Sequence, residues 1–209
     1  MLTNRTSSAK ARRKQAAANL MVALRELLEE GTAFSDITIQ QITERGGVSR
    51  PAFYSHFVDK NELLSRLVVD ALAPVTARMS EQMGEWPSGP AHMPTALRAA
   101  IEYLEPHRVV IAAFLEVANY DADVAAALHA SVTAFRGELT QRIHRQQQAG
   151  VALGGDASTI ALALSALAIE MVREFVNGAN GVDAQRWVEI MSLVWGRVVY
   201  GDQAGPVAG

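Results

Sequence analysis

The 209-residue sequence contains no cysteine. This absence excludes a disulfide framework, a thiolate metal site and a cysteine nucleophile. No stretch reaches the roughly 18 consecutive apolar residues that a membrane-spanning helix requires, so we expect no membrane partner. The basic N-terminal region is followed by an amphipathic pattern in place of the apolar segment of a secretion signal. We therefore expect a cytoplasmic protein.

Residue patterns typical of catalytic sites are also missing. The five histidines show neither the H-x-x-x-H spacing of metal sites nor the E-x-x-H pattern of di-iron helical bundles. No glycine-rich loop that could cradle a phosphate is present. We therefore expect no enzyme, no catalytic residues, no metal and no cofactor.

The net charge is only −3, but the charge is unevenly distributed. Residues 1–66 carry ten basic and seven acidic side chains, whereas residues 67–209 carry nine basic and fifteen acidic ones. Five basic residues precede the first acidic residue, Glu26, and these are Arg5, Lys10, Arg12, Arg13 and Lys14. Such a run is typical of a solvated tail and equally of an arm that follows a DNA minor groove.

Helical periodicity of apolar residues runs through the chain, and no segment shows sustained strand alternation. The pattern predicts an all-α fold of about nine helices. We expect an N-terminal three-helix domain at residues 1–66 and a larger helical domain at residues 67–209. The first helix is expected from Ala9 to Glu30, with Gly31 ending it. The later helices are expected at residues 94–104, 107–118, 121–149, 156–177 and 183–200.

A short second helix is predicted between a side-chain cap and a glycine pair. Thr38 and Gln41 have the spacing of a capping box, which predicts a helix from Ile39 to Arg45. The pair Gly46 and Gly47 ends it, because glycine tolerates the left-handed conformation that follows many helices.

A third helix is predicted immediately afterwards. Ser49 can cap it, and Pro51 lies in its first turn, where a missing amide proton costs little. A further cap at Asp59 opens a fourth helix that reaches about Gly84. Two short helices joined by a glycine turn form a helix-turn-helix.

The third helix is expected to present a polar side to DNA. Phe53 and Phe57 stand four residues apart and face inward, which leaves the other faces exposed. Arginine can bind guanine in the major groove, and capped helix ends can hold phosphates. The residues expected to contact DNA are Thr38, Gln40, Ser49, Arg50, Ala52, Tyr54, His56 and Lys60. Some also fit structural roles, such as ring packing by Tyr54.

Seven positions in the segment TIQQITERGGVSRPAFYSHFVDKNELL keep a fixed spacing, and these are Gly47, Val48, Ser49, Tyr54, Phe57, Lys60 and Leu63. With this spacing, the region from about Ala11 to Ser65 resembles the DNA-binding domain of TetR-family transcriptional regulators. The ending from Trp195 to Gly201 is similar to the EthR branch of that family. The resemblance implies a dimeric repressor that leaves a DNA operator when a small molecule enters its C-terminal domain.

Dimerisation is also expected from the energetics of DNA recognition. One short helix offers about two base contacts worth ~1 to 3 kcal/mol each, whereas discrimination against nonspecific DNA needs ~4 to 10 kcal/mol. Two copies related by a twofold axis would read a palindromic operator. The last two helices are apolar on several faces and form the expected homodimer interface, although part of them must serve the internal core.

Large apolar side chains in the C-terminal part fit either a ligand cavity or plain core. The residues expected to contact a small apolar effector are Met93, Leu97, Tyr103, Phe114, Phe135, Glu170, Met171 and Trp195. Glu170 either orients the ligand, pairs with Arg173 or Arg136, or faces solvent. The alternative function is an all-helical small-molecule-binding protein or enzyme whose helix-turn-helix is only structural.

Overall fold

The computed structural model describes residues 2–84, 93–178 and 184–201, and every regular element in them is a helix. The all-α prediction is therefore confirmed. Contacts divide the chain into two compact units. The first unit contains Met1–Ala71 and Val109–Ala125, and the second contains Leu72–Arg108 and Ala126–Gly209. The boundaries between the units fall within α4 (Lys60–Gly84) and α7 (Ala122–Gln148) and at the first residue of α6 (Arg108–Val117).

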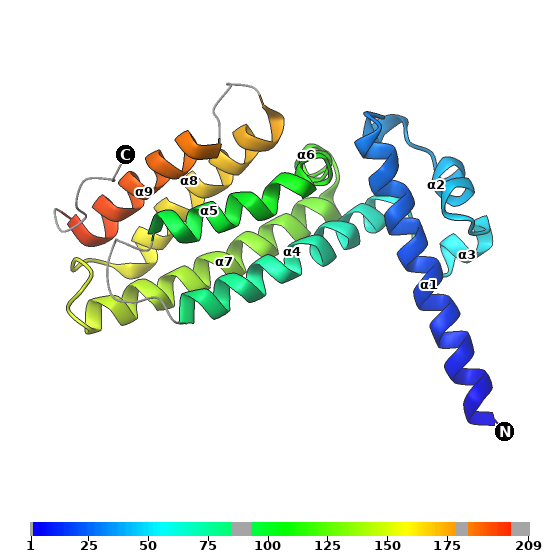
Figure 1. The fold of residues 1–209 in the computed structure, drawn as a ribbon, viewed down its shortest axis with the longest axis horizontal. Coiled ribbons are helices and arrows are strands. Elements are labelled where there is room, and N and C mark those ends of the chain that lie inside the picture. Colours follow the sequence, from blue (N-terminus) through cyan, green and yellow to red (C-terminus); the bar gives the residue numbers. More distant parts are fainter. Residues whose placement is uncertain (1, 85–92, 179–183, 202–209) are drawn as a thin grey trace. The chain divides into compact units, whose positions relative to one another are not determined.

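The first unit is built on the long helix α1 (Leu2–Glu29). A short 3-10 turn, η1 (Phe34–Asp36), leads into α2 (Ile39–Gly46) and α3 (Arg50–Tyr54). Both short helices pack against α1 and against each other (Figure 1). Their apolar sides share a core whose members are fully or almost fully buried: Leu20, Leu24, Ile37, Ile42, Phe53, Leu63 and Leu64.

The start of α1 differs from the predicted one, and α3 is short. Helix α1 begins at Leu2 and not at Ala9, because no proline or glycine interrupts residues 2–29. The basic N-terminal run is therefore part of a helix. Helix α3 has only five residues and ends at Tyr54. Ser55 caps its C-terminal end, and the Ser55 hydroxyl donates to the Ala52 carbonyl oxygen at 2.7 Å.

Polar contacts are made by the first residue of helix α6 (Arg108–Val117) and by Asp121, which follows this helix. Within the second unit, Arg108 Nε donates to the Val176 carbonyl oxygen at 2.8 Å. Within the first unit, Asp121 Oδ2 accepts from Asn61 Nδ2 at 2.7 Å, and its Oδ1 accepts from the Val124 amide at 2.9 Å. These hydrogen bonds lower the pKa of Asp121. They fix the start of α7 against the first turn of α4.

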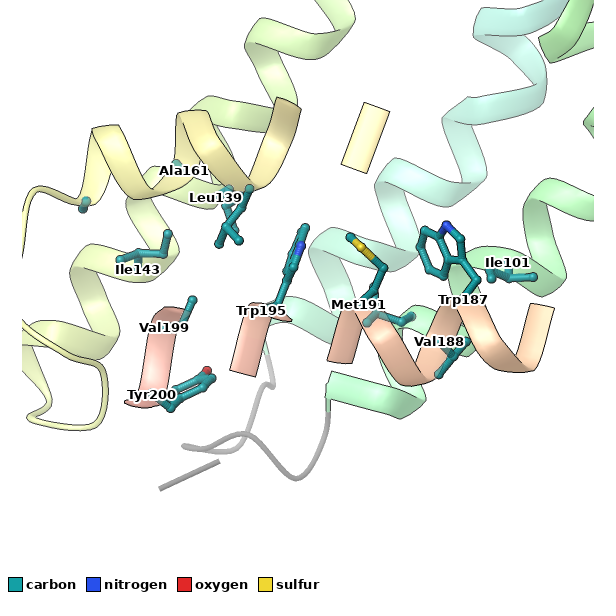
Figure 2. Packing of buried hydrophobic residues seen from close by; sticks show 13 residues of the cluster. Ile101, Leu139, Ile143, Ala161, Trp187, Val188, Met191, Trp195, Val199 and Tyr200 are labelled. Carbon is teal, nitrogen blue, oxygen red and sulfur yellow. The ribbon is translucent and has the colours of Figure 1, made fainter. Parts of the chain in front are cut away.

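The second unit contains α5 (Met93–Leu104), α8 (Ala157–Asn177) and α9 (Ala184–Tyr200), and α9 packs against both α5 and α8. A short turn, η3 (Glu105–His107), follows α5. Figure 2 shows the buried cluster that joins these helices to α7. Fully burying a large apolar side chain, such as leucine or methionine, stabilises the fold by roughly 1.5–3 kcal/mol. The predicted bounds of these helices agree with the observed ones to within about two residues.

No helix among the described residues is both long enough and apolar enough to cross a membrane.

Candidate nucleic-acid interface

The start of α2 is fixed by the predicted capping box. Thr38 Oγ1 accepts from the Gln41 amide at 3.2 Å, and Gln41 Oε1 accepts from the Thr38 amide at 2.7 Å. Thr38 and Gln40 are both exposed, and Gln40 Nε2 donates to Glu44 Oε1 at 2.8 Å. The capped end of α2 therefore faces solvent with two polar side chains.

The turn between α2 and α3 depends on one glycine conformation. Gly47 has a φ of +61°, in the left-handed region that favours glycine. Ser49 follows as the predicted N-cap, and its Oγ accepts from the Ala52 amide at 3.3 Å. Pro51 occupies the first turn as expected. The two helices are thus joined by a tight turn, which confirms the helix-turn-helix.

Helix α3 buries one side and exposes the other. Phe53 is completely buried, whereas Arg50 is exposed and the side chain of Tyr54 is 49% exposed. The Arg50 guanidinium carbon lies 5.9 Å from the centroid of the Tyr54 ring, a cation–π distance. Ala52 and His56 are half-buried. The exposed surface of α3 therefore combines a cation with an aromatic hydroxyl.

Two contacts from α1 hold the helix-turn-helix in place, and neither is evident from residue spacing in the sequence. Arg13 Nη2 donates to the Ser55 carbonyl oxygen at 3.2 Å, beyond the end of α3. Asn19 Nδ2 donates to the Gly46 carbonyl oxygen at 3.3 Å. A Cβ atom at Gly46 would lie 3.3 Å from the Asn19 carbonyl oxygen, so glycine permits this close approach. One basic residue of the N-terminal run thus has a structural partner.

Lys60 makes structural contacts in this structure, and its expected phosphate contact stays a prediction. Its Nζ donates to the carbonyl oxygens of Phe34 at 2.8 Å, Ser35 at 3.0 Å and Ile37 at 2.8 Å. An ammonium group has three N–H donors, so these bonds use all of them. Partial burial lowers the pKa of Lys60, and the nearby Asp36 opposes that shift. The residue ties the start of α4 to the segment that enters α2.

The residues expected to contact a ligand are only partly brought together. Leu97 and Trp195 belong to the buried cluster of the second unit, and Phe135 and Met171 pack against that cluster. Phe114 instead belongs to the first unit, where it is 4% exposed. Its side chain is core of the unit that contains α2 and α3, which is the plain-core alternative that the sequence left open.

Glu170 lies on an exposed face, and its expected ligand contact stays a prediction. Its side chain is 65% exposed, and its Oε2 lies 3.6 Å from Arg173 Nε. Of the alternatives that the sequence left open, the structure shows the pair with Arg173 on an exposed face. Tyr103 is half-buried with its ring 5.2 Å from that of His107, while the side chain of Met93 lies outside the described part.

Within the residues that the structure describes, no three His, Cys, Asp or Glu side chains come together as a metal site.

Comparison with known proteins identifies the family. Residues 20–67 match the family model of the bacterial regulatory proteins of the tetR family. Residues 93–201, about half of the chain, match the C-terminal domain of the transcriptional regulator EthR. The chain therefore belongs to the TetR family of bacterial transcriptional regulators, with a C-terminal domain of the EthR type.

Solved structures share this fold at low sequence identity. The structure titled SmeT-Triclosan complex has 17% identity and a TM-score of 0.75, covering 93% of this chain and 95% of that chain. A bacterial regulatory protein of the tetR family from Rhodococcus RHA1 has 20% identity and a TM-score of 0.63, covering 88% and 97%. No curated protein matches the sequence.

Proposed function

We propose that the protein is a dimeric transcriptional repressor that binds a palindromic DNA operator and is released from it by a small apolar ligand. The observation that carries the proposal is the exposed side of α3, with Arg50 and Tyr54 held outward by the burial of Phe53. An arginine at a helix N-terminus can bind guanine in bidentate fashion in the major groove. A tyrosine hydroxyl can bind a backbone phosphate.

The other residues expected to contact DNA would position the protein on the duplex by binding its phosphates. Thr38 and Gln40 lie exposed at the N-terminal end of α2, where free amide groups favour phosphate. Ser49 and Ala52 lie in the first turn of α3, and His56 follows its end. Lys60 is left out of this set, because its donors already bind backbone carbonyls.

The proposed dimer uses α8 and α9. Each helix exposes large apolar side chains that a monomer would leave in water, namely Leu162, Ile190, Leu193 and Val198 at 42–49% exposure. These side chains lie on the two helices that pack against each other in the second unit. Two copies of each helix would bury the residues in a four-helix interface. A dimer would also contain two copies of α3, one for each half of a palindromic site.

The proposal that a ligand releases the protein from DNA is based on the type of its C-terminal domain. The chain shares its fold with the protein of the SmeT-Triclosan complex, a structure that pairs a relative with a small, largely apolar molecule. In this chain, Phe135, Met171 and Phe175 are only partly buried where they pack against the core cluster. Such side chains can repack around a ligand more readily than fully buried ones.

The test is selection of fragments of the source genome by the purified protein, followed by a gel shift on the recovered sequences. We expect a palindromic consensus and a shift that survives competitor DNA. Failure to retain any sequence over random DNA would contradict the proposal and favour a helical binding protein whose helix-turn-helix is only structural.

A further inference from the structure

The N-terminal half of α1 is a basic helix without acidic residues. The helix begins at Leu2, and residues 2–14 include five Lys or Arg side chains and no Asp or Glu. The first turn contains no acidic residue either. Because carboxylates stabilise the N-terminal end of a helix and cations oppose the helix dipole there, this distribution of charge is unfavourable for the helix by itself. The charges therefore point to an anionic partner.

Four of the five cations form two rows on either side of Arg13. Positions seven apart share a helix face, as Arg5 and Arg12 do, and positions four apart also share one, as Lys10 and Lys14 do. At 3.6 residues per turn, each row stands roughly a quarter turn from Arg13. Arg12 and Lys14 are exposed. Like charges four residues apart destabilise a helix, so anions that neutralise these rows would stabilise α1.

One hydrogen bond places this basic helix beside α3. Arg13 Nη2 donates to the carbonyl oxygen of Ser55, the residue that follows α3, at 3.2 Å. From Leu2 to Arg13 the helix covers ~16 Å along its axis, and Figure 1 shows these turns of α1 continuing past α3. Duplex DNA carries one phosphate charge per ~1.7 Å of its axis. A basic helix of this length next to α3 can therefore face several phosphates at once.

The helical conformation of the basic run limits how it can meet a duplex. An α-helix with its side chains is ~10–12 Å across, whereas the minor groove is ~6 Å wide. The run therefore cannot follow the minor groove, as an extended arm would. It is also continuous with the part of α1 whose Leu20 and Leu24 are completely buried, which makes it a direct extension of the core of the first unit. The phosphate backbone remains open to such a helix, and phosphate contacts carry no sequence information directly.

We propose that residues 2–14 bind the phosphate backbone of duplex DNA as a basic helix, which adds affinity but no sequence preference to the helix-turn-helix. The proposal rests on the proposed DNA-binding function and assigns a second DNA-binding surface to the same unit. Phosphates neutralise both rows of cations and remove the repulsion within the helix. Amide hydrogen exchange of these residues should therefore slow when duplex DNA of any sequence is added.

Paired removal of charges in the full-length protein tests the proposal. One variant combines Arg5→Gln with Arg12→Gln, and the other combines Lys10→Gln with Lys14→Gln. Each variant removes one row, and glutamine is a good helix former, so the helix itself should be retained. Affinity for a random duplex and for the selected operator is then measured over a range of salt concentrations.

We expect at least one row variant to reduce the salt slope on both duplexes by about two units, because each lost phosphate contact lowers the slope by ~0.9. The preference for the operator over the random duplex should not change. The matched control combines Arg98→Gln with Arg145→Gln, which removes two exposed charges of the second unit and changes the net charge by the same amount. The control should keep the salt slope of the unmodified protein.

Three outcomes would overturn the proposal. The first is a salt slope in both row variants equal to that of the control. The second is a loss of operator preference in a row variant, because the run would then read bases. The third is weaker binding to anionic lipid vesicles with unchanged salt slopes on DNA, which would identify a membrane surface as the partner. An unmodified protein without operator preference, whose row variants still lose salt slope on the random duplex, would count against the proposed function alone.

Discussion

Individual side chains around α3 divide into those that hold the segment and those that it exposes. Phe53 is buried and anchors the helix, while Arg50 and Tyr54 extend into solvent. Arg13 Nη2 and Lys60 Nζ donate hydrogen bonds to backbone carbonyl oxygens of neighbouring segments. Substitutions of the holding residues should therefore change stability, and substitutions of the exposed residues should change DNA binding.

Lys60→Met should destabilise the protein by about 1.5–3 kcal/mol. The substitution keeps an apolar stem but removes the ammonium that binds three carbonyl oxygens, and hydrogen bonds to charged groups contribute on this order. Urea unfolding measures the change. Arg66→Met is the control, because Arg66 is exposed and forms a surface ion pair with Asp70, and it should change stability by less than about 0.5 kcal/mol. Unchanged stability with a salt slope of DNA binding reduced by about one unit would instead make Lys60 a phosphate ligand.

At the scale of helices, the caps decide where the short elements begin. Ser49→Ala should cost about 1 kcal/mol, because the Ala52 amide loses its acceptor. Ser49→Asp keeps a capping oxygen and should retain nearly all of the stability, yet its negative charge should weaken DNA binding if this turn faces phosphates. Thermal unfolding and gel shift separate the two effects. Normal DNA binding by Ser49→Asp would place this turn away from the duplex.

The cap of α8 predicts an acid-dependent stability. Asp156 accepts from the Thr159 amide at 2.8 Å and from the Thr159 and Ser158 hydroxyls, and these bonds lower its pKa to about 2. Because the pKa is lower in the folded state than the usual 3.8, this stabilisation is present above pH 4 and is lost as the pH falls towards 2. Asp156→Asn should keep a cap but flatten the fall in melting temperature over that interval. An equally steep fall in the variant would show that other carboxylates cause it.

Helix ends were predictable where cap and partner lie within a few residues of each other. Thr38 with Gln41, the turn at Gly47 and the Ser49 cap are all local in the sequence, and the structure has each of them. The partners of Lys60 lie 23 to 26 residues away, and Arg13 lies 42 residues from Ser55. Such pairs depend on how helices pack, so residue type and spacing could not reveal them. The same reason explains why the sequence left open whether Phe114 lines a ligand site or belongs to a core.

At the scale of the whole molecule, each of the two units has its own buried core, and the second unit leaves apolar side chains of α8 and α9 in water. Leu193 is 43% exposed and Ile190 is 44% exposed, on the opposite side of α9 from the buried Trp195. A helix with apolar residues on both sides requires a covering partner. A second copy of this chain is the partner that the proposed function supplies.

Leu193→Glu should convert the protein from dimer to monomer at micromolar concentration. A charge in an apolar interface loses hydration without gaining a partner, at a cost of several kcal/mol. Sedimentation equilibrium measures the change. Val22→Glu is the matched control, since Val22 is 44% exposed on α1, outside the proposed interface, and its variant should remain dimeric. A monomeric unmodified protein would contradict the prediction.

The most direct test of the account is the affinity of the protein for its selected operator and for single-base variants of it, measured over a range of salt concentrations. We expect a strong preference for the operator, and we expect Arg50→Ala to relax that preference by ~1 to 3 kcal/mol at one position in each half-site. An Arg50→Ala variant that keeps the full preference, or an unmodified protein that binds all duplexes equally, would contradict the claim that the exposed side of α3 reads DNA.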